Sequence, residues 1–203
     1  MFSPSSAFPG ARWKQLNGDN DDGRLWQSED LQKQAAPFWT DLAWKLRDHP
    51  ALVGYDLLNE PHPGRTLAGL EEVTSQGCRA WQRSVAGSAP DLNRWNRRLV
   101  TAIRSVDNRT PIIVEPAGYA ALAAVPLLEP IDDEAVICSF HTYEPWVYTT
   151  KRANQGRYEY PSRMPIGWHD GTEAWDRNQI TEAFAAVGEW TRSHALPPSR
   201  VLL

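Results

Sequence analysis

The chain has 203 residues, a length typical of one domain, and 41% of them are hydrophobic, enough for a sizeable core. The formal net charge is −4 and no basic block interrupts the sequence, so we expect neither nucleic acid nor an anionic membrane as a partner. No apolar run approaches the length of a membrane span. These bulk properties leave the oligomeric state open.

The amino-terminal segment, residues 1–27, is rich in Pro, Gly, Asn and Asp, which is typical of loops. Its start lacks a charged region followed by an apolar one, so we do not expect a signal peptide. Cys78 and Cys138 fit no metal-binding spacing, and no cofactor is expected. We interpret both cysteines as small buried or half-buried residues, and a disulfide between them is left open.

Three segments have the periodicity of amphipathic helices. The first begins at Ser28 and ends near Asp48-His49-Pro50, and we expect Pro37 to kink it or to split it. The second begins at a capping box of Ser88-Ala89-Pro90-Asp91. The third begins at a similar box, Asp176-Arg177-Asn178-Gln179, and stops at Pro197-Pro198. Residues 61–87 are expected to form a long polar loop.

Short apolar stretches between these segments predict strands at residues 51–58, 111–118 and 135–143, with the start of another at Val201-Leu202-Leu203. A short helix is expected between the second and third strands. Because strands alternate with helices, the sequence predicts an α/β fold with a parallel sheet, either open and doubly wound or part of a barrel. In both cases functional residues belong at the carboxyl ends of the strands.

Polar residues followed by proline stand at the ends of these strands. The first strand ends in Asn59-Glu60-Pro61, the second in Glu115-Pro116, and the third in His141-Thr142-Tyr143-Glu144-Pro145. One such end would be ordinary, but three at one edge of a sheet predict a site.

The Asn-Glu-Pro motif after an apolar strand, with His-x-Tyr two strands later, resembles glycoside hydrolase family 5, the cellulase and mannanase family. Residues 9–26 and the helix that carries FWTDLAWKL also resemble the segment that precedes this motif in the family. The resemblance covers roughly residues 9–203. It implies a (β/α)8 barrel and retaining hydrolysis of β-glycosidic bonds in a polysaccharide, without a cofactor. It also implies a secreted or periplasmic protein.

The chemistry of that reaction explains the motif. A retaining glycosidase needs two carboxyl groups about 5 Å apart, and the one that protonates the leaving oxygen needs a raised pKa. By resemblance this acid/base is Glu60. Asn59 would bind the sugar 2-hydroxyl, and His141 and Tyr143 would line the same cleft.

Other residues are candidates for substrate binding. Glu115 and Glu144 are either substrate contacts or plain charges at the rim. Aromatic rings stack on sugar faces, so Tyr119, Trp146 and Trp168 are candidate substrate-binding rings, as is Tyr148, although burial in the core is the commoner fate of a tryptophan. Asp56 is expected to have a structural role inside its strand. The spacing of Asn59, Glu60 and His62 does not suit a metal site.

The resemblance is incomplete in one respect. The nucleophilic carboxylate of the family follows the seventh barrel strand, and no such residue follows Arg200-Val201-Leu202-Leu203. A full barrel also needs about 250 residues. We therefore expect residues 1–203 to form an incomplete barrel domain, roughly from strand three or four to the start of strand seven, that hydrolyses little by itself.

Two functions remain open at this stage. The first is a retaining endo-β-glycosidase of the cellulase, β-glucanase or mannanase type. The alternative is a non-catalytic carbohydrate-binding or interaction protein derived from the same barrel. The sequence does not distinguish between different polysaccharides or between endo and exo action.

Overall fold

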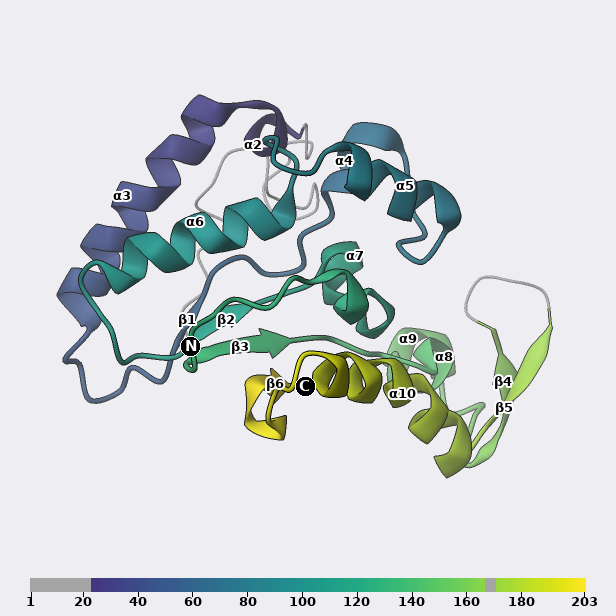
Figure 1. Ribbon diagram of the computed structural model, residues 1–203. Helices are drawn as coiled ribbons and strands as arrows, with labels where there is room; N and C mark the ends of the chain where they lie inside the picture. Colours follow the sequence, from purple (N-terminus) through teal and green to yellow (C-terminus); the bar gives the residue numbers. More distant parts are fainter. Residues whose placement is uncertain (1–22, 167–170) are drawn as a thin grey trace.

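A parallel sheet is the centre of the computed structural model, which describes residues 23–166 and 171–203. Its strands are β1 (Tyr55–Asp56), β2 (Ile112–Val114), β3 (Val136–Ser139) and β6 (Val201–Leu202), in that spatial order. Every neighbouring pair is parallel, with Tyr55 opposite Ile112, Ile112 opposite Val136, and Cys138 opposite Val201. The predicted parallel α/β fold is therefore confirmed (Figure 1).

Helices connect the strands. Their bounds are α2 (Arg24–Gln27), α3 (Glu29–Leu46), α4 (Pro63–Ala68), α5 (Gln76–Ser84), α6 (Leu92–Arg104), α7 (Ala117–Ala120), α8 (Trp146–Thr149), α9 (Lys151–Asn154) and α10 (Arg177–Ser193), with 3-10 turns η1 (Leu122–Leu127) and η2 (Pro198–Arg200). A separate antiparallel hairpin is formed by β4 (Ser162–Pro165) and β5 (Thr172–Trp175). The sequence did not predict this hairpin.

The long helix α3 runs without interruption through Pro37, so the alternative that Pro37 splits it is wrong. Ser28 caps its start by accepting a hydrogen bond from the Leu31 backbone N–H at 3.2 Å. Trp39 and Ala43 on its inner face are fully buried, and Trp39 packs edge-on against Tyr55 of β1. A proline inside a helix costs about 3 kcal/mol. Burial of this apolar face offsets that cost.

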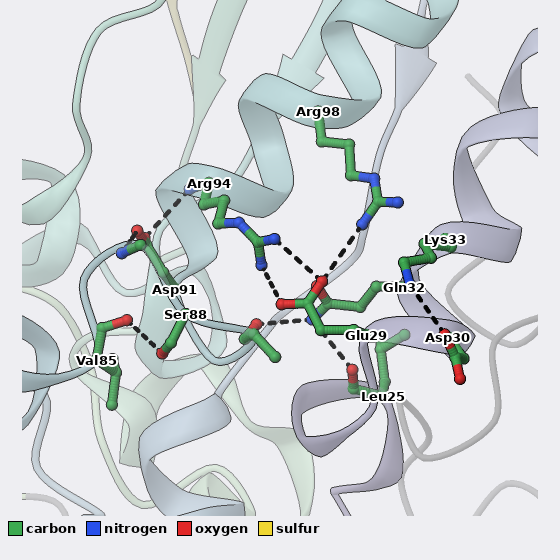
Figure 2. Close-up of polar contacts among 12 residues, drawn as sticks. Leu25, Glu29, Asp30, Gln32, Lys33, Val85, Ser88, Asp91, Arg94 and Arg98 are labelled. Atoms are coloured by element: carbon green, nitrogen blue, oxygen red, sulfur yellow. Dashed lines mark hydrogen bonds and ion pairs between the residues drawn. The ribbon is translucent and has the colours of Figure 1, made fainter.

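Helices α3 and α6 lie side by side, as Figure 1 shows, and polar contacts join their amino-terminal ends. Arg94 of α6 holds Glu29 of α3 through two nitrogens, at 2.6 and 3.0 Å (Figure 2). The buried Gln32 amide donates to the Leu25 carbonyl at 3.1 Å and to the Ala89 carbonyl at 2.6 Å. Because an unpaired buried amide is costly, these contacts fix how α2 and the loop before α6 meet α3.

The capping residue of α6 differs from the predicted one. Asp91, the last residue of the expected box, is the N-cap: its Oδ1 accepts from the Asn93 and Arg94 N–H groups at 2.9 and 3.1 Å. The prediction of a start at Ser88 is wrong by one turn, because the carboxylate at 91 reaches two of the free N–H groups of the first turn. For α10, the predicted cap Asp176 is confirmed by its bonds from Asn178 and Gln179.

The segment expected to be a long polar loop, residues 61–87, contains α4 and α5. His62 and Ser75 cap them through hydrogen bonds from the Arg65 and Cys78 backbone N–H groups. Gly64 allows the close approach of the two helices, because a Cβ at this position would lie 3.3 Å from the Trp81 ring. The prediction failed because these helices are short and their packing partners are distant in the sequence.

The amino-terminal end of the sheet carries a different polar cluster. Tyr55 donates its hydroxyl to Asp107 at 2.9 Å, and the other Asp107 oxygen accepts from the Arg109 and Thr110 N–H groups. Burial acts to raise the pKa of Asp107, but these hydrogen bonds outweigh it and the net direction is downward. The cluster closes the turn from α6 into β2 and is therefore structural.

Cys78 and Cys138 are both buried and form no disulfide, which agrees with their interpretation as small buried residues. Within residues 23–166 and 171–203, no helix is both long enough and apolar enough to cross a membrane. In the same described part of the chain, β1 pairs only with β2, and β6 pairs only with β3.

Candidate active site

The carboxyl ends of β1, β2 and β3 point toward the region of α7, α8 and α9 in Figure 1. Glu60 follows β1, Glu115 follows β2 directly, and His141 follows β3. The backbone continues the sheet beyond β3, because the His141 N–H donates to the Ala120 carbonyl at 2.8 Å. The parallel register thus brings together three ionisable side chains that are up to 81 residues apart in the sequence.

His141 lies between the two carboxyl groups. Its Nδ1 is 2.9 Å from Glu60 Oε1, and its Nε2 is 3.4 Å from Glu115 Oε1. The second oxygen of Glu115, Oε2, accepts the backbone N–H of Glu60 at 2.6 Å. The three residues therefore form a closed ring of contacts across three strand ends.

Glu60 has a left-handed backbone, with a φ of 54°. This conformation costs a residue other than glycine about 1–3 kcal/mol, and a following proline such as Pro61 normally favours an extended backbone. Strain of this kind persists only where surrounding contacts compensate for it. At Glu60 the compensating contact is the hydrogen bond to Glu115.

Glu115 is the carboxyl group with the most unusual environment. Burial raises its pKa to about 7, and the negative charge of Asp56 on β1 acts in the same direction. Its side chain is only 2% exposed, which leaves almost no surface for a sugar hydroxyl. Asp56 is itself buried, at 4% exposed, which agrees with the expected structural role. Burial and the charge of Glu115 raise the pKa of the nearby Cys138 thiol to about 12, which disfavours the thiolate form.

The other predicted site residues lie in the segments that follow β1 and β3. Asn59 precedes Glu60 and is half-buried. Tyr143 is 61% exposed and its carbonyl accepts a hydrogen bond from the Thr149 hydroxyl at 2.5 Å. Glu144 is exposed and its carboxylate accepts the Trp146 N–H at 3.1 Å, at the start of the short helix α8. Strand β3 ends at Ser139, before the end predicted at residue 143, and His141 joins the sheet through a parallel bridge to Ala121.

The candidate aromatic residues have different environments. Tyr119 is half-buried in the turn after β2, where it forms a T-shaped pair with the His62 ring at a centroid distance of 4.9 Å. Trp146 packs against the small hydrophobic cluster of Val147, Met164 and Trp175 beneath the hairpin. Tyr148 is exposed beside Tyr160. Trp168 lies outside the described residues.

His62 has a supporting role that the sequence did not predict. Its Nδ1 accepts the Arg65 N–H at 3.3 Å, so its Nε2 carries the proton and donates to the Glu71 carbonyl at 3.2 Å. Its ring packs against Tyr119, which follows β2. In the described segments, no group of three or more His, Cys, Asp or Glu side chains is arranged to hold a metal ion.

The arrangement is suited to proton transfer at one carboxyl group that is partly open to solvent. The Glu60 side chain retains 19% exposure and is held by an imidazole, whereas Glu115 lies beneath it. The fold and this site define an α/β protein with a carboxyl group presented at the carboxyl edge of a parallel sheet.

Comparison with known proteins identifies the family. A family model described as cellulase (glycosyl hydrolase family 5) matches residues 11–197. The chain therefore belongs to glycosyl hydrolase family 5.

Individual relatives are distant. Endoglucanase C of Acetivibrio thermocellus is 23% identical over 167 residues, which is 79% of this chain and 41% of the relative. Endoglucanase C307 of a Clostridium species has the same identity and coverage. The chain thus spans about two-fifths of the length of these curated relatives.

Solved structures show the same fold. The endoglucanase Cel5A of Thermotoga maritima has a TM-score of 0.58 at 20% identity, with 86% of this chain and 48% of that chain covered. The same enzyme in complex with mannotriose gives a TM-score of 0.56, also at 20% identity, with 86% of this chain and 49% of that one covered. The parallel α/β arrangement described above matches these neighbours.

Proposed function

We propose that the chain is part of the catalytic domain of a retaining endo-β-glycosidase in which Glu60 is the general acid and base. The contact of Glu60 with His141, made at the carboxyl edge of the sheet, is the observation that supports this most directly. Membership of the cellulase family and similarity to endoglucanases support endo action. The proposed range is an incomplete (β/α)8 barrel over residues 1–203, from strand three or four to the start of strand seven. Its first segment, residues 1–27, was predicted to be rich in loops and ends in the short helix α2.

The proposed roles of the neighbouring residues follow from the reaction. Glu60 protonates the leaving oxygen and then takes a proton from water. His141 orients the Glu60 carboxyl group, and Asn59 binds the sugar beside the bond to be broken. Tyr143 and Tyr119 are proposed to line the cleft, because their exposed or half-buried rings suit contact with a sugar. Trp146, Trp168 and Glu144 remain proposed substrate contacts.

The nucleophile is the part of the mechanism that Glu115 does not supply. A retaining enzyme holds the sugar between its two carboxyl groups, which are about 5–5.5 Å apart. Glu115 instead accepts the backbone N–H of Glu60 from below, so no sugar fits between the two side chains. We therefore propose that residues 1–203 alone hydrolyse little, and clear glycosidase turnover by the purified chain would contradict this.

The proposed substrate is a β-linked glucan or mannan. Thermotoga maritima Cel5A is described in complex with both cellobiose and mannotriose, and it has the same fold as this chain. A panel of polysaccharides from both classes, assayed with the longest form of the protein that its gene encodes, tests this choice. Activity confined to other linkages would refute it.

The acid role of Glu60 is tested by Glu60→Gln in that longest form. Glutamine keeps the shape but has no acidic proton, so turnover of a substrate with a poor leaving group should fall by about 100-fold or more. An aryl glycoside with an activated leaving group needs little protonation and should lose much less. Equal loss on both substrates would disprove the assignment.

A non-catalytic sugar-binding protein is the second candidate, because Glu115 is not placed as a nucleophile. The two candidates differ in one measurement. The binding protein would bind oligosaccharide with equal affinity before and after Glu60→Gln and would release no reducing sugar in any form.

A further inference from the structure

Glu115 uses both of its carboxyl oxygens on the groups that surround the proton donor. Oε2 accepts the Glu60 N–H at 2.6 Å, and Oε1 lies 3.4 Å from His141 Nε2. The opposite ring nitrogen, Nδ1, lies 2.9 Å from Glu60 Oε1. One buried side chain on β2 thus contacts both the backbone of the donor and the imidazole that touches its carboxyl group.

We propose that Glu115 is a positioning residue that fixes the left-handed backbone of Glu60 and holds a proton on Nε2 of His141. The inference rests on the proposed function, since it assigns Glu115 a role in holding the proton donor. Residues with a left-handed backbone are usually glycine, but glycine at position 60 would have no carboxyl group. The hydrogen bond from Glu60 to Glu115 allows a glutamate to occupy this conformation.

The second part of the proposal concerns the protons of His141. In a neutral imidazole one nitrogen donates and the other accepts. A proton on Nε2, directed at Glu115, leaves Nδ1 as the acceptor for the acidic proton of Glu60. With Glu115 ionised, Nδ1 can thus accept a hydrogen bond from the carboxyl proton that a general acid at Glu60 carries.

The other groups around Glu115 act in the same direction or do not compete for the imidazole. Asp56 on β1 adds negative charge beside Glu115, and Glu60 contacts the other ring nitrogen. Cys138 on β3 carries a thiol whose pKa is raised by burial and by Glu115. His141 is the one cation-forming side chain that the described residues place in contact with Glu115.

Glu115→Gln gives an unequivocal test, because the direction of the new amide is fixed. Its oxygen must face the Glu60 N–H, which only donates, so its NH2 group must face Nε2 of His141. That NH2 group donates, and it forces Nε2 to become an acceptor. The variant should therefore remove the Nε2 proton while it keeps the volume of the side chain.

The measurement is ¹⁵N NMR of the histidine rings in the 203-residue protein at a mildly alkaline pH, with His141 assigned from its loss in His141→Asn. We expect Nε2 to be protonated in the wild type and bare in Glu115→Gln, seen as a large downfield shift of its ¹⁵N signal. His62 is the internal control, because its Nε2 should stay protonated in both proteins. An unchanged Nε2 signal of His141 would overturn the proposal.

A second variant keeps the test decisive if Glu115→Gln does not fold. In Glu60→Gln the buried Glu115 remains, so Nε2 should stay protonated, and its loss there would show that Glu60 rather than Glu115 holds this proton. Neither readout needs turnover. The proposal for Glu115 can therefore fail while Glu60 remains the acid. Equally, the acid role of Glu60 can fail while Glu115 still holds the Nε2 proton.

Discussion

Replacement of Glu115 by glutamine should also change how the stability of the protein depends on pH. Burial and the charge of Asp56 raise the pKa of Glu115 from 4.5 to about 7. Between these pH values the folded protein keeps a proton that the unfolded chain has lost. The contribution of Glu115 to the free energy of unfolding is therefore fully present below pH 4.5 and is lost as the pH rises to 7.

The size of the effect follows from this difference. Each pH unit corresponds to about 1.36 kcal/mol, so the interval from 4.5 to 7 corresponds to about 3 kcal/mol. Glutamine does not ionise and can still accept the Glu60 N–H. The variant should therefore lose less stability than the wild type between acidic and mildly alkaline pH, by up to about 3 kcal/mol.

Urea denaturation followed by tryptophan fluorescence measures this difference at a series of pH values. The matched control is Glu182→Gln, which replaces an exposed carboxyl group on α10. Its free energy of unfolding should change with pH in parallel with that of the wild type. If the curves of Glu115→Gln and the wild type are also parallel throughout, Glu115 does not titrate as a buried group, and the reasoning from burial is refuted.

Three further predictions concern the fold. Asp91→Ala removes the cap of α6 and should lower the free energy of unfolding by about 0.5–2 kcal/mol in urea titrations, whereas Asp41→Ala on the exposed face of α3 should change it little. Leu99→Ala opens a cavity in the core and should cost about 2–5 kcal/mol in the same assay; a cost below 1 kcal/mol, roughly that of a surface change, would contradict its full burial. The edge strands β1 and β6 each have one partner among the described residues, and Leu203 is 68% exposed, so the purified chain should self-associate. Light scattering of a monodisperse monomer at high concentration would contradict this last expectation.

The sequence alone predicted the repeating elements of the fold. The apolar runs predicted the positions of β2, β3 and β6, and the helical periodicity predicted α3, α6 and α10. These signals are strong because each element buries an apolar face, and the spacing of its apolar residues can be seen within a short stretch of sequence. The family motifs Asn-Glu-Pro and His-x-Tyr could also be recognised, because each consists of residues that are adjacent or nearly adjacent in the sequence.

Features that depend on distant contacts were missed or misplaced. The sequence indicated a kink or a split at Pro37, but the helix is not split, and Trp39 of its inner face packs against Tyr55 of the sheet. Helices α4 and α5 were missed because their packing depends on the close approach of Gly64 to Trp81. The cap of α6 was placed at Ser88, although the carboxylate of Asp91 is the group that reaches the free N–H groups.

Glu115 shows most clearly what the sequence determined and what it left to the tertiary structure. The chain determined that a glutamate ends the second strand beside a proline, and a sugar contact and a rim charge were equally reasonable interpretations. Only the parallel register of β1, β2 and β3 buried that carboxyl group under Glu60 and against His141. The physical reason is that burial and hydrogen bonding belong to neighbours in space, and these three neighbours are brought together by the sheet rather than by the order of residues.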